Sequence, residues 1–147
     1  MGAYRQILVA VDGSEAAACG LREALRLAKA EAAQLCIVHV VDDSYHAYTP
    51  LSAAPPADIR PLLIESGRRL LAEAAAQAKT QGVEARAILR DAAEGVAPGI
   101  LALAAEHGVE LIVLGTHGRR GVRRLVLGSD AEQVVRAANV PVLLVRA

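Results

Sequence analysis

The apolar residues of this 147-residue chain follow two alternating patterns, and that alternation restricts the fold more than any other feature. Continuous apolar runs lie at residues 7–11, 35–41, 111–114 and 142–145. Such runs are typical of strands buried on both faces of a sheet. A fifth segment, 83–89, alternates apolar with polar residues and is expected to be a less buried strand.

Helical patterns separate these five segments. After Ser14, which is suited to capping a helix, apolar residues recur at helical spacing at Leu21, Leu25, Ala28 and Ala32. Further helices are expected from about 58 to a stop at Gly82, from about 96 to 107, and from 129 to near 139. Strands that alternate with helices predict an α/β fold, an open parallel sheet with helices on both faces. No linker or repeat divides residues 1–147, so we expect a single domain.

Residues 115–129 are rich in glycine and arginine. Glycines at 115, 118 and 128 remove side chains where a main chain approaches a ligand, so peptide N–H groups can converge on an anion. Gly128 and Ser129 then open a helix, whose free N–H groups and dipole favour negative charge. Four guanidinium groups that suit phosphate oxygens lie in the same segment, on Arg119, Arg120, Arg123 and Arg124. This composition favours a phosphate-binding loop over the alternative, a solvated basic turn.

The glycine spacing differs from that of the common phosphate loops. It has neither the Gly-x-x-x-x-Gly-Lys-Ser/Thr pattern nor the Gly-x-Gly start of the dinucleotide fingerprint. It reads instead Gly-x-x-Gly-x9-Gly-Ser. Three other segments accompany it: Ile-Leu-Val-Ala-Val-Asp-Gly-Ser at 7–14, His-Val-Val-Asp at 39–42 and Val-Pro-Val-Leu-Leu-Val-Arg at 140–146. Together they resemble the ATP-binding branch of the universal stress protein family.

The resemblance implies a particular sheet and a place for the site. Its fold is Rossmann-like, of the adenine nucleotide alpha hydrolase-like type, with five strands in the order 3-2-1-4-5. In open α/β sheets, ligands bind beyond the carboxyl ends of the strands, where the strand order reverses. That point falls between the first strand, which ends at Asp12, and the fourth, which ends at Gly115.

The resemblance also assigns roles to individual residues. Asp12 is expected to bind the ribose hydroxyls, although an aspartate in Asp-Gly-Ser can simply form a turn. The main chain near Ala10 and Val40 is expected to hold the adenine edge, and Arg119 to reach the γ-phosphate. The remaining backbone contacts to ribose and phosphates are expected from Leu114, Gly115, His117, Gly118, Gly128 and Ser129.

Asp130 departs from the family pattern, which more often has a small apolar residue after Gly-Ser. A carboxylate in the first turn of a helix complements the helix dipole, and this structural role is the interpretation we prefer. The alternative is that Asp130 coordinates Mg2+ beside the phosphates. The implied cofactor is ATP with Mg2+, and no metal ligand is assigned.

Charge and hydropathy exclude several other functions. The formal net charge is zero, so nothing draws the whole chain toward nucleic acid or a membrane surface. No apolar run reaches membrane-spanning length and the first residues lack a signal-peptide pattern, so we expect a cytoplasmic protein. Cys19 and Cys36 lack metal or redox spacing and are expected to be small buried hydrophobes.

No catalytic set is evident. His117 is the only imidazole expected in the site, and His39 is expected to be a hydrogen-bonded core residue. Three functions stay open. The preferred one is a non-enzymatic, ATP-binding stress-response or signalling module with at most slow hydrolysis. The others are an ATP hydrolase or autophosphorylating phosphotransferase, and a nucleotide-free dimeric interaction protein.

Two surface features complete these expectations. In the implied topology Val142–Val145 is an apolar edge strand, and similar proteins pair this strand with its two-fold mate, so we expect a homodimer. Residues 42–57 form a long connection that contains Tyr45 and Tyr48. These rings could stack on a base or cover a partner, but a surface loop is the favoured interpretation.

Overall fold

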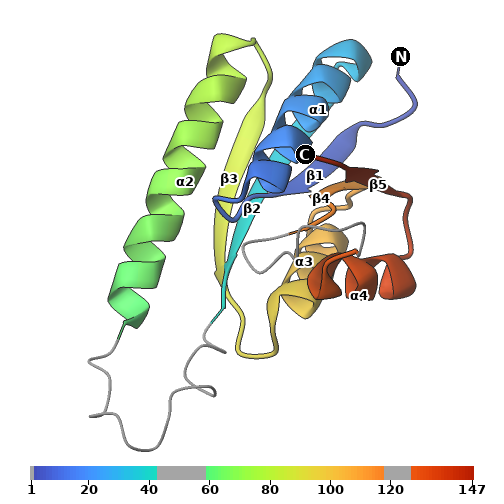
Figure 1. Ribbon diagram of the computed structural model, residues 1–147. Coiled ribbons are helices and arrows are strands. Elements are labelled where there is room, and N and C mark those ends of the chain that lie inside the picture. The colour runs from blue at the N-terminus through green and yellow to red at the C-terminus, as the bar shows by residue number, and fades with distance from the viewer. Residues whose placement is uncertain (1, 43–58, 118–126) are drawn as a thin grey trace, which may run out of the picture.

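Strands and helices alternate along the chain in a computed structural model that describes residues 2–42, 59–117 and 127–147 (Figure 1). The strands are β1 (Gln6–Ala10), β2 (Gln34–Val41), β3 (Ala85–Asp91), β4 (Leu111–Gly115) and β5 (Val142–Val145). The helices are α1 (Glu15–Glu31), α2 (Arg60–Thr80), α3 (Val96–Glu106) and α4 (Ser129–Ala137). The segment with Tyr45 and Tyr48 lies outside the described residues.

All strand pairs in the sheet are parallel, and the strand order is β3-β2-β1-β4-β5. The α/β architecture and the 3-2-1-4-5 order expected from the sequence are therefore confirmed. β1 lies at the centre, and the strand order reverses between β1 and β4. In register, Val9 of β1 lies beside Ile37 of β2 and Val113 of β4.

Helices cover both faces of the sheet (Figure 1), and an apolar layer lies between the helices and each face. On one face α1 and α2 pack on side chains such as Ile7 and Ile37, and on the other α3 and α4 pack on Leu8 and Ile112. Every buried apolar side chain in the described part of the chain is Ile, Leu, Val, Ala or Cys, so this core contains no aromatic ring. Branched aliphatic side chains fit a sheet covered on both faces, where each strand needs apolar residues at successive positions.

The ends of the helices and strands lie close to those expected from the sequence, with differences at the end of α1 and the start of β3. Ser14 caps α1, since its Oγ accepts the Ala17 N–H at 3.1 Å. Ala32 does not continue α1 but ends it in the left-handed conformation, φ 53°. Pro61 lies in the first turn of α2, where its missing N–H costs nothing. β3 begins two residues later than expected because the Val83 N–H is bonded to the Ala78 carbonyl and so closes the end of α2.

The cysteines differ in environment. Cys36 is buried in β2, as expected, whereas Cys19 is partly exposed, which corrects the expectation that both are buried. Cys19 lies on α1, where the Arg22 guanidinium donates to its sulfur at 2.9 Å. Among the described residues, no helix has both the length and the hydropathy needed to cross a bilayer.

Candidate functional site

The candidate site lies at the carboxyl ends of β1 and β4, where the strand order reverses. α1 leaves β1 onto one face of the sheet, whereas α4 begins after β4 and covers the other face (Figure 1). The segments that follow β1 and β4 are thus flanked by the first turns of two helices. Partially positive helix starts at a strand-order reversal are a common setting for anion and nucleotide binding.

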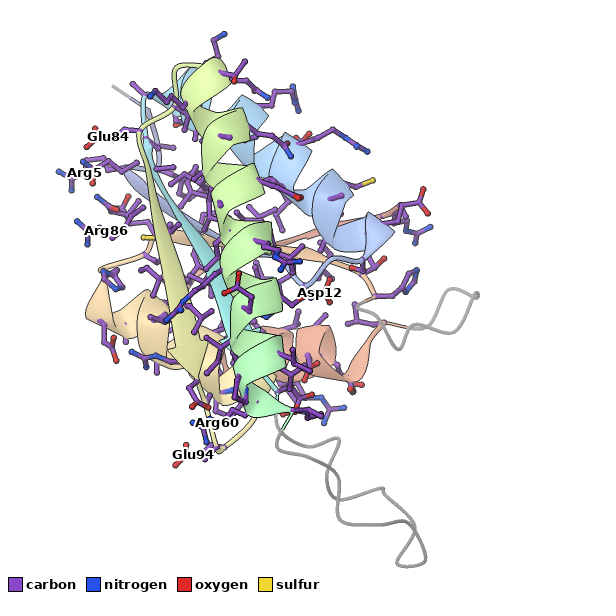
Figure 2. All side chains as sticks on the ribbon, turned by 90° about the vertical axis from the view of Figure 1, so that its left-hand side faces the viewer. Arg5, Asp12, Arg60, Glu84, Arg86 and Glu94 are labelled. Atoms are coloured by element: carbon purple, nitrogen blue, oxygen red, sulfur yellow. The ribbon has the colours of Figure 1, made fainter. Side chains whose placement is uncertain are left out.

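Asp12 lies in the tight turn between β1 and α1 (Figure 2). Its Oδ1 accepts the Ser14 N–H at 2.8 Å, and Gly13 takes φ 84°, a conformation that favours glycine. Asp12 therefore does form the turn that its Asp-Gly-Ser context indicates. Its second oxygen, Oδ2, accepts no hydrogen bond within the described parts of the chain. A half-exposed carboxylate with one oxygen engaged still has an acceptor for a ligand hydroxyl.

Ser14 connects this turn to the segment after β4. Its hydroxyl accepts the Ala17 N–H and also donates to the carbonyl oxygen of His117 at 3.4 Å. One side chain thus caps α1 and holds the residues that follow β4 beside the Asp12 turn. The sequence indicated the cap, but it carries no signal for the second contact, which joins residues 103 positions apart.

Glycines bring α1 and β4 into direct backbone contact. A Cβ built on Gly115 would lie 2.6 Å from the Ala16 carbonyl carbon, and one built on Gly20 would lie 3.3 Å from the Gly115 nitrogen. Gly115 therefore does more than free the main chain for a ligand, since α1 packs where its side chain would be. The sequence pattern indicated only a role in nucleotide binding for Gly115, because nothing in it reveals this packing against α1.

The start of α4 is tied to the end of β4. The Gly128 N–H donates to the Thr116 carbonyl at 2.7 Å, and the Thr116 N–H continues the ladder to Val145 at 3.0 Å. Gly128 is the N-cap of α4 and has no side chain with which to cap the helix. The first N–H groups of α4 therefore lie beside the end of β4 and receive no acceptor from the N-cap residue, so an anion can serve as their acceptor.

The other predicted residues fall into two groups. Leu114 and Val40 are buried, Ala10 is half-buried, and all three pack with the layer under α3 and α4. Ser129 and Asp130 are exposed in the first turn of α4, where Asp130 and Glu132 complement the helix dipole. Gly118 and the arginines at 119, 120, 123 and 124 lie outside the described residues.

The described residues show no metal site made of protein side chains alone. Within residues 2–42, 59–117 and 127–147, no group of three or more His, Cys, Asp or Glu side chains is placed to hold a metal ion.

Comparison with known proteins identifies the family. The model of the universal stress protein family matches residues 3–146. The chain belongs to the universal stress protein family. A search of curated protein sequences found no significant match.

Solved structures of universal stress proteins share the fold. A family member from Burkholderia pseudomallei is 36% identical, with all of both chains covered and a TM-score of 0.81. The universal stress protein UspA from Lactobacillus plantarum is 28% identical over 97% of this chain and 98% of its own, with a TM-score of 0.71. A universal stress protein from Archaeoglobus fulgidus, solved in complex with dAMP, is 26% identical over 97% of this chain and 98% of its own, with a TM-score of 0.71.

Proposed function

We propose that this universal stress protein binds an adenine nucleotide, ATP with Mg2+, between the ends of β1 and β4, and that the bound nucleotide controls its surface or assembly in a stress response. One observation carries the proposal. The hydrogen bonds from Ser14 to His117 and from Gly128 to Thr116 bring together the Asp12 turn, the end of β4 and the start of α4 at the carboxyl end of the sheet. The dAMP complex of the Archaeoglobus fulgidus relative supports an adenine nucleotide as the ligand class.

The chemical groups at this end of the sheet can bind the ribose and the phosphates of ATP. The free oxygen of Asp12 can accept a ribose hydroxyl, and the N–H groups at the start of α4 can donate to phosphate oxygens. The arginines at 119, 120, 123 and 124 add cations that a triphosphate requires more than a monophosphate does. In this proposal His117 contributes its main chain, and no residue acts as a general base.

Calorimetry with MgATP on wild type and Asp12→Asn tests the proposal. The asparagine keeps an oxygen for the Ser14 N–H and removes the charge, so we expect affinity to fall roughly tenfold to a hundredfold, the usual cost of losing a charged hydrogen bond. The matched control is Asp91→Asn, the same substitution at the end of β3, which faces Arg60 of α2. We expect this control to bind as wild type does.

The nucleotide carried by freshly purified protein distinguishes the alternatives. ATP released on denaturing wild type, but absent from a Gly118→Ala/Gly128→Ala double variant, supports the proposal. Protein that is empty and gives no calorimetric signal with MgATP favours the nucleotide-free interaction protein. Sustained phosphate release by wild type above the Asp12→Asn background favours the hydrolase.

A further inference from the structure

The main chain of β2 faces its two neighbours alternately. The Gln34 N–H donates to the Arg5 carbonyl and the Val38 carbonyl accepts the Val11 N–H, both across to the β1 side. The Leu35 N–H donates instead to the main-chain carbonyl of Glu84, on the β3 side. Because this direction alternates along a strand, the main-chain groups of Val40 point toward β1. The next regular bond in the ladder would run from the Val40 N–H to the Val11 carbonyl.

A side chain takes the place of that bond. His39 Nδ1 lies 2.7 Å from the Val11 carbonyl oxygen, and no hydrogen bond joins the Val40 N–H to Val11 among the described residues. A carbonyl only accepts, so Nδ1 carries the proton in this contact. The imidazole thus ends the β1–β2 ladder one step early.

Packing fixes the imidazole in this position. A Cβ built on Gly67 of α2 would lie 2.5 Å from His39 Cδ2 and 3.0 Å from Nε2, so glycine provides the space for the ring. On the other face of the sheet, Val40 Cγ1 lies 3.0 Å from where a Cβ on Gly99 would be. The two residues are therefore held by helices on opposite faces.

The consequence is a strand end with unpaired polar groups in a buried setting. Val40 is only 7% exposed, and buried main-chain donors and acceptors are almost always paired. An N–H and a C=O that have no partner among the described residues, at the carboxyl end of β2, complement a ligand edge that offers an acceptor next to a donor. The ring nitrogen N1 and the 6-amino group of adenine have this pattern.

We infer that His39 is a positioning residue for the base: by occupying the Val11 carbonyl, it keeps the main chain of Val40 open to the edge of an adenine ring. This inference rests on the proposed nucleotide site and assigns a residue that sets its base specificity. Without the imidazole donor, the Val11 carbonyl pairs with the Val40 N–H and the strand end closes.

Binding of ATP and ITP by three proteins tests the inference. Hypoxanthine carries a proton on N1 and an oxygen at position 6, the reverse of adenine, so wild type is expected to prefer ATP. His39→Leu removes the donor and is expected to reduce the ATP-to-ITP preference by about tenfold, the value of one buried hydrogen bond. His39→Asn places an amide N–H close to the position of Nδ1 and is expected to retain most of the preference.

A purely structural role for His39 predicts a different result. His39→Leu would then lower the melting temperature and leave the ATP-to-ITP ratio unchanged, and that outcome overturns the inference. Equal preference in wild type overturns it as well.

Amide hydrogen exchange without nucleotide separates this inference from the proposed function. In wild type the Val40 amide is expected to exchange much faster than the Val38 amide, and in His39→Leu it is expected to slow. A Val40 amide as protected as Val38 in wild type overturns the inference even if ATP binds. A fast Val40 amide in a protein that binds no nucleotide supports the open strand end and rejects the nucleotide site instead.

Discussion

At the scale of single residues, carboxylates fix the entry of the chain into the sheet. Glu110, just before β4, accepts the main-chain N–H groups of Arg5 and Gln6, and Glu31 accepts that of Tyr4 at 3.2 Å. The Arg5 N–H is the main cause that holds the pKa of Glu110 below its usual range. Burial opposes it, and the Gln6 N–H and the Arg5 charge lower the pKa further. The contribution of these hydrogen bonds to the stability of the folded protein therefore depends on pH.

Glu110→Gln tests that component. The pKa of Glu110 is lower in the folded protein than in the unfolded chain, so its contribution is complete above the unfolded pKa and is lost as pH falls through the folded pKa. We expect the variant to melt below wild type at neutral pH, and the two melting temperatures to converge in acid. Thermal unfolding followed by circular dichroism measures this.

The control for this experiment is Glu94→Gln, on the exposed loop before α3 (Figure 2). It is expected to track wild type across the same pH range. A difference between Glu110→Gln and wild type that persists unchanged in acid would contradict the assignment.

Residue-scale chemistry was the hardest to anticipate from the sequence. Asp12, Gly115 and Gly128 stand out because their types suit a ligand. The His39 contact with Val11 and the Ser14 contact with His117 were not predicted, since each depends on how far a strand or turn continues before it diverges. A histidine in an apolar run indicates a hydrogen-bonded ring but does not identify the acceptor.

At the scale of elements, Ser14 both caps α1 and contacts the segment after β4, so it contributes to stability and to the position of the site. Ser14→Ala removes both the cap and the contact with His117, so we expect a loss of about 1 kcal/mol of stability. Ser14→Gly retains most of the cap energy, because glycine at an N-cap costs only a few tenths of a kcal/mol. It cannot donate to His117, so nucleotide affinity is expected to fall about threefold to tenfold with little change in melting temperature.

Ser14→Thr provides the matched control, since threonine both accepts and donates. It is expected to keep wild-type melting and affinity. Equal nucleotide affinity of Ser14→Gly and Ser14→Thr in calorimetry would show that the His117 contact does not position the site.

Most elements were predictable because the strands of a covered parallel sheet need apolar residues at successive positions, which the runs in β1, β2, β4 and β5 supply. β3 lies at an edge and is only partly buried, so its pattern was weaker and its start was misplaced by two residues. There the buried Val83 belongs to the end of α2, which periodicity alone does not distinguish from a strand.

At the scale of the whole molecule, β5 leaves one edge of the sheet open. Its four residues are all partly exposed, and β4 is its partner in the described sheet. The Ile112 N–H donates to the Pro141 carbonyl and the Thr116 N–H to the Val145 carbonyl, so the main-chain groups of Val142 point away from β4. We propose that two copies of the chain pair along this edge.

Val142→Pro tests the pairing. Proline removes the outward N–H of Val142 and leaves the bonds to β4 in place, because an edge strand tolerates proline where its N–H faces outward. We expect wild type to be a dimer by light scattering at micromolar concentration and the variant to shift toward monomer. Val142→Ala, which removes side-chain volume and keeps the N–H, is expected to remain dimeric. A monomeric wild type is the result that rejects the pairing.

The aliphatic core has a practical consequence for spectroscopy. The chain has no Trp or Phe and only three Tyr, so the protein itself absorbs weakly in the near ultraviolet. A purine base held at the sheet edge would be the strongest chromophore in the molecule. The ratio of absorbance at about 260 nm to that at about 280 nm therefore reports nucleotide occupancy directly, as a purine absorbs near the shorter wavelength and tyrosine near the longer. The absorbance spectrum of each purified variant thus shows whether nucleotide is bound.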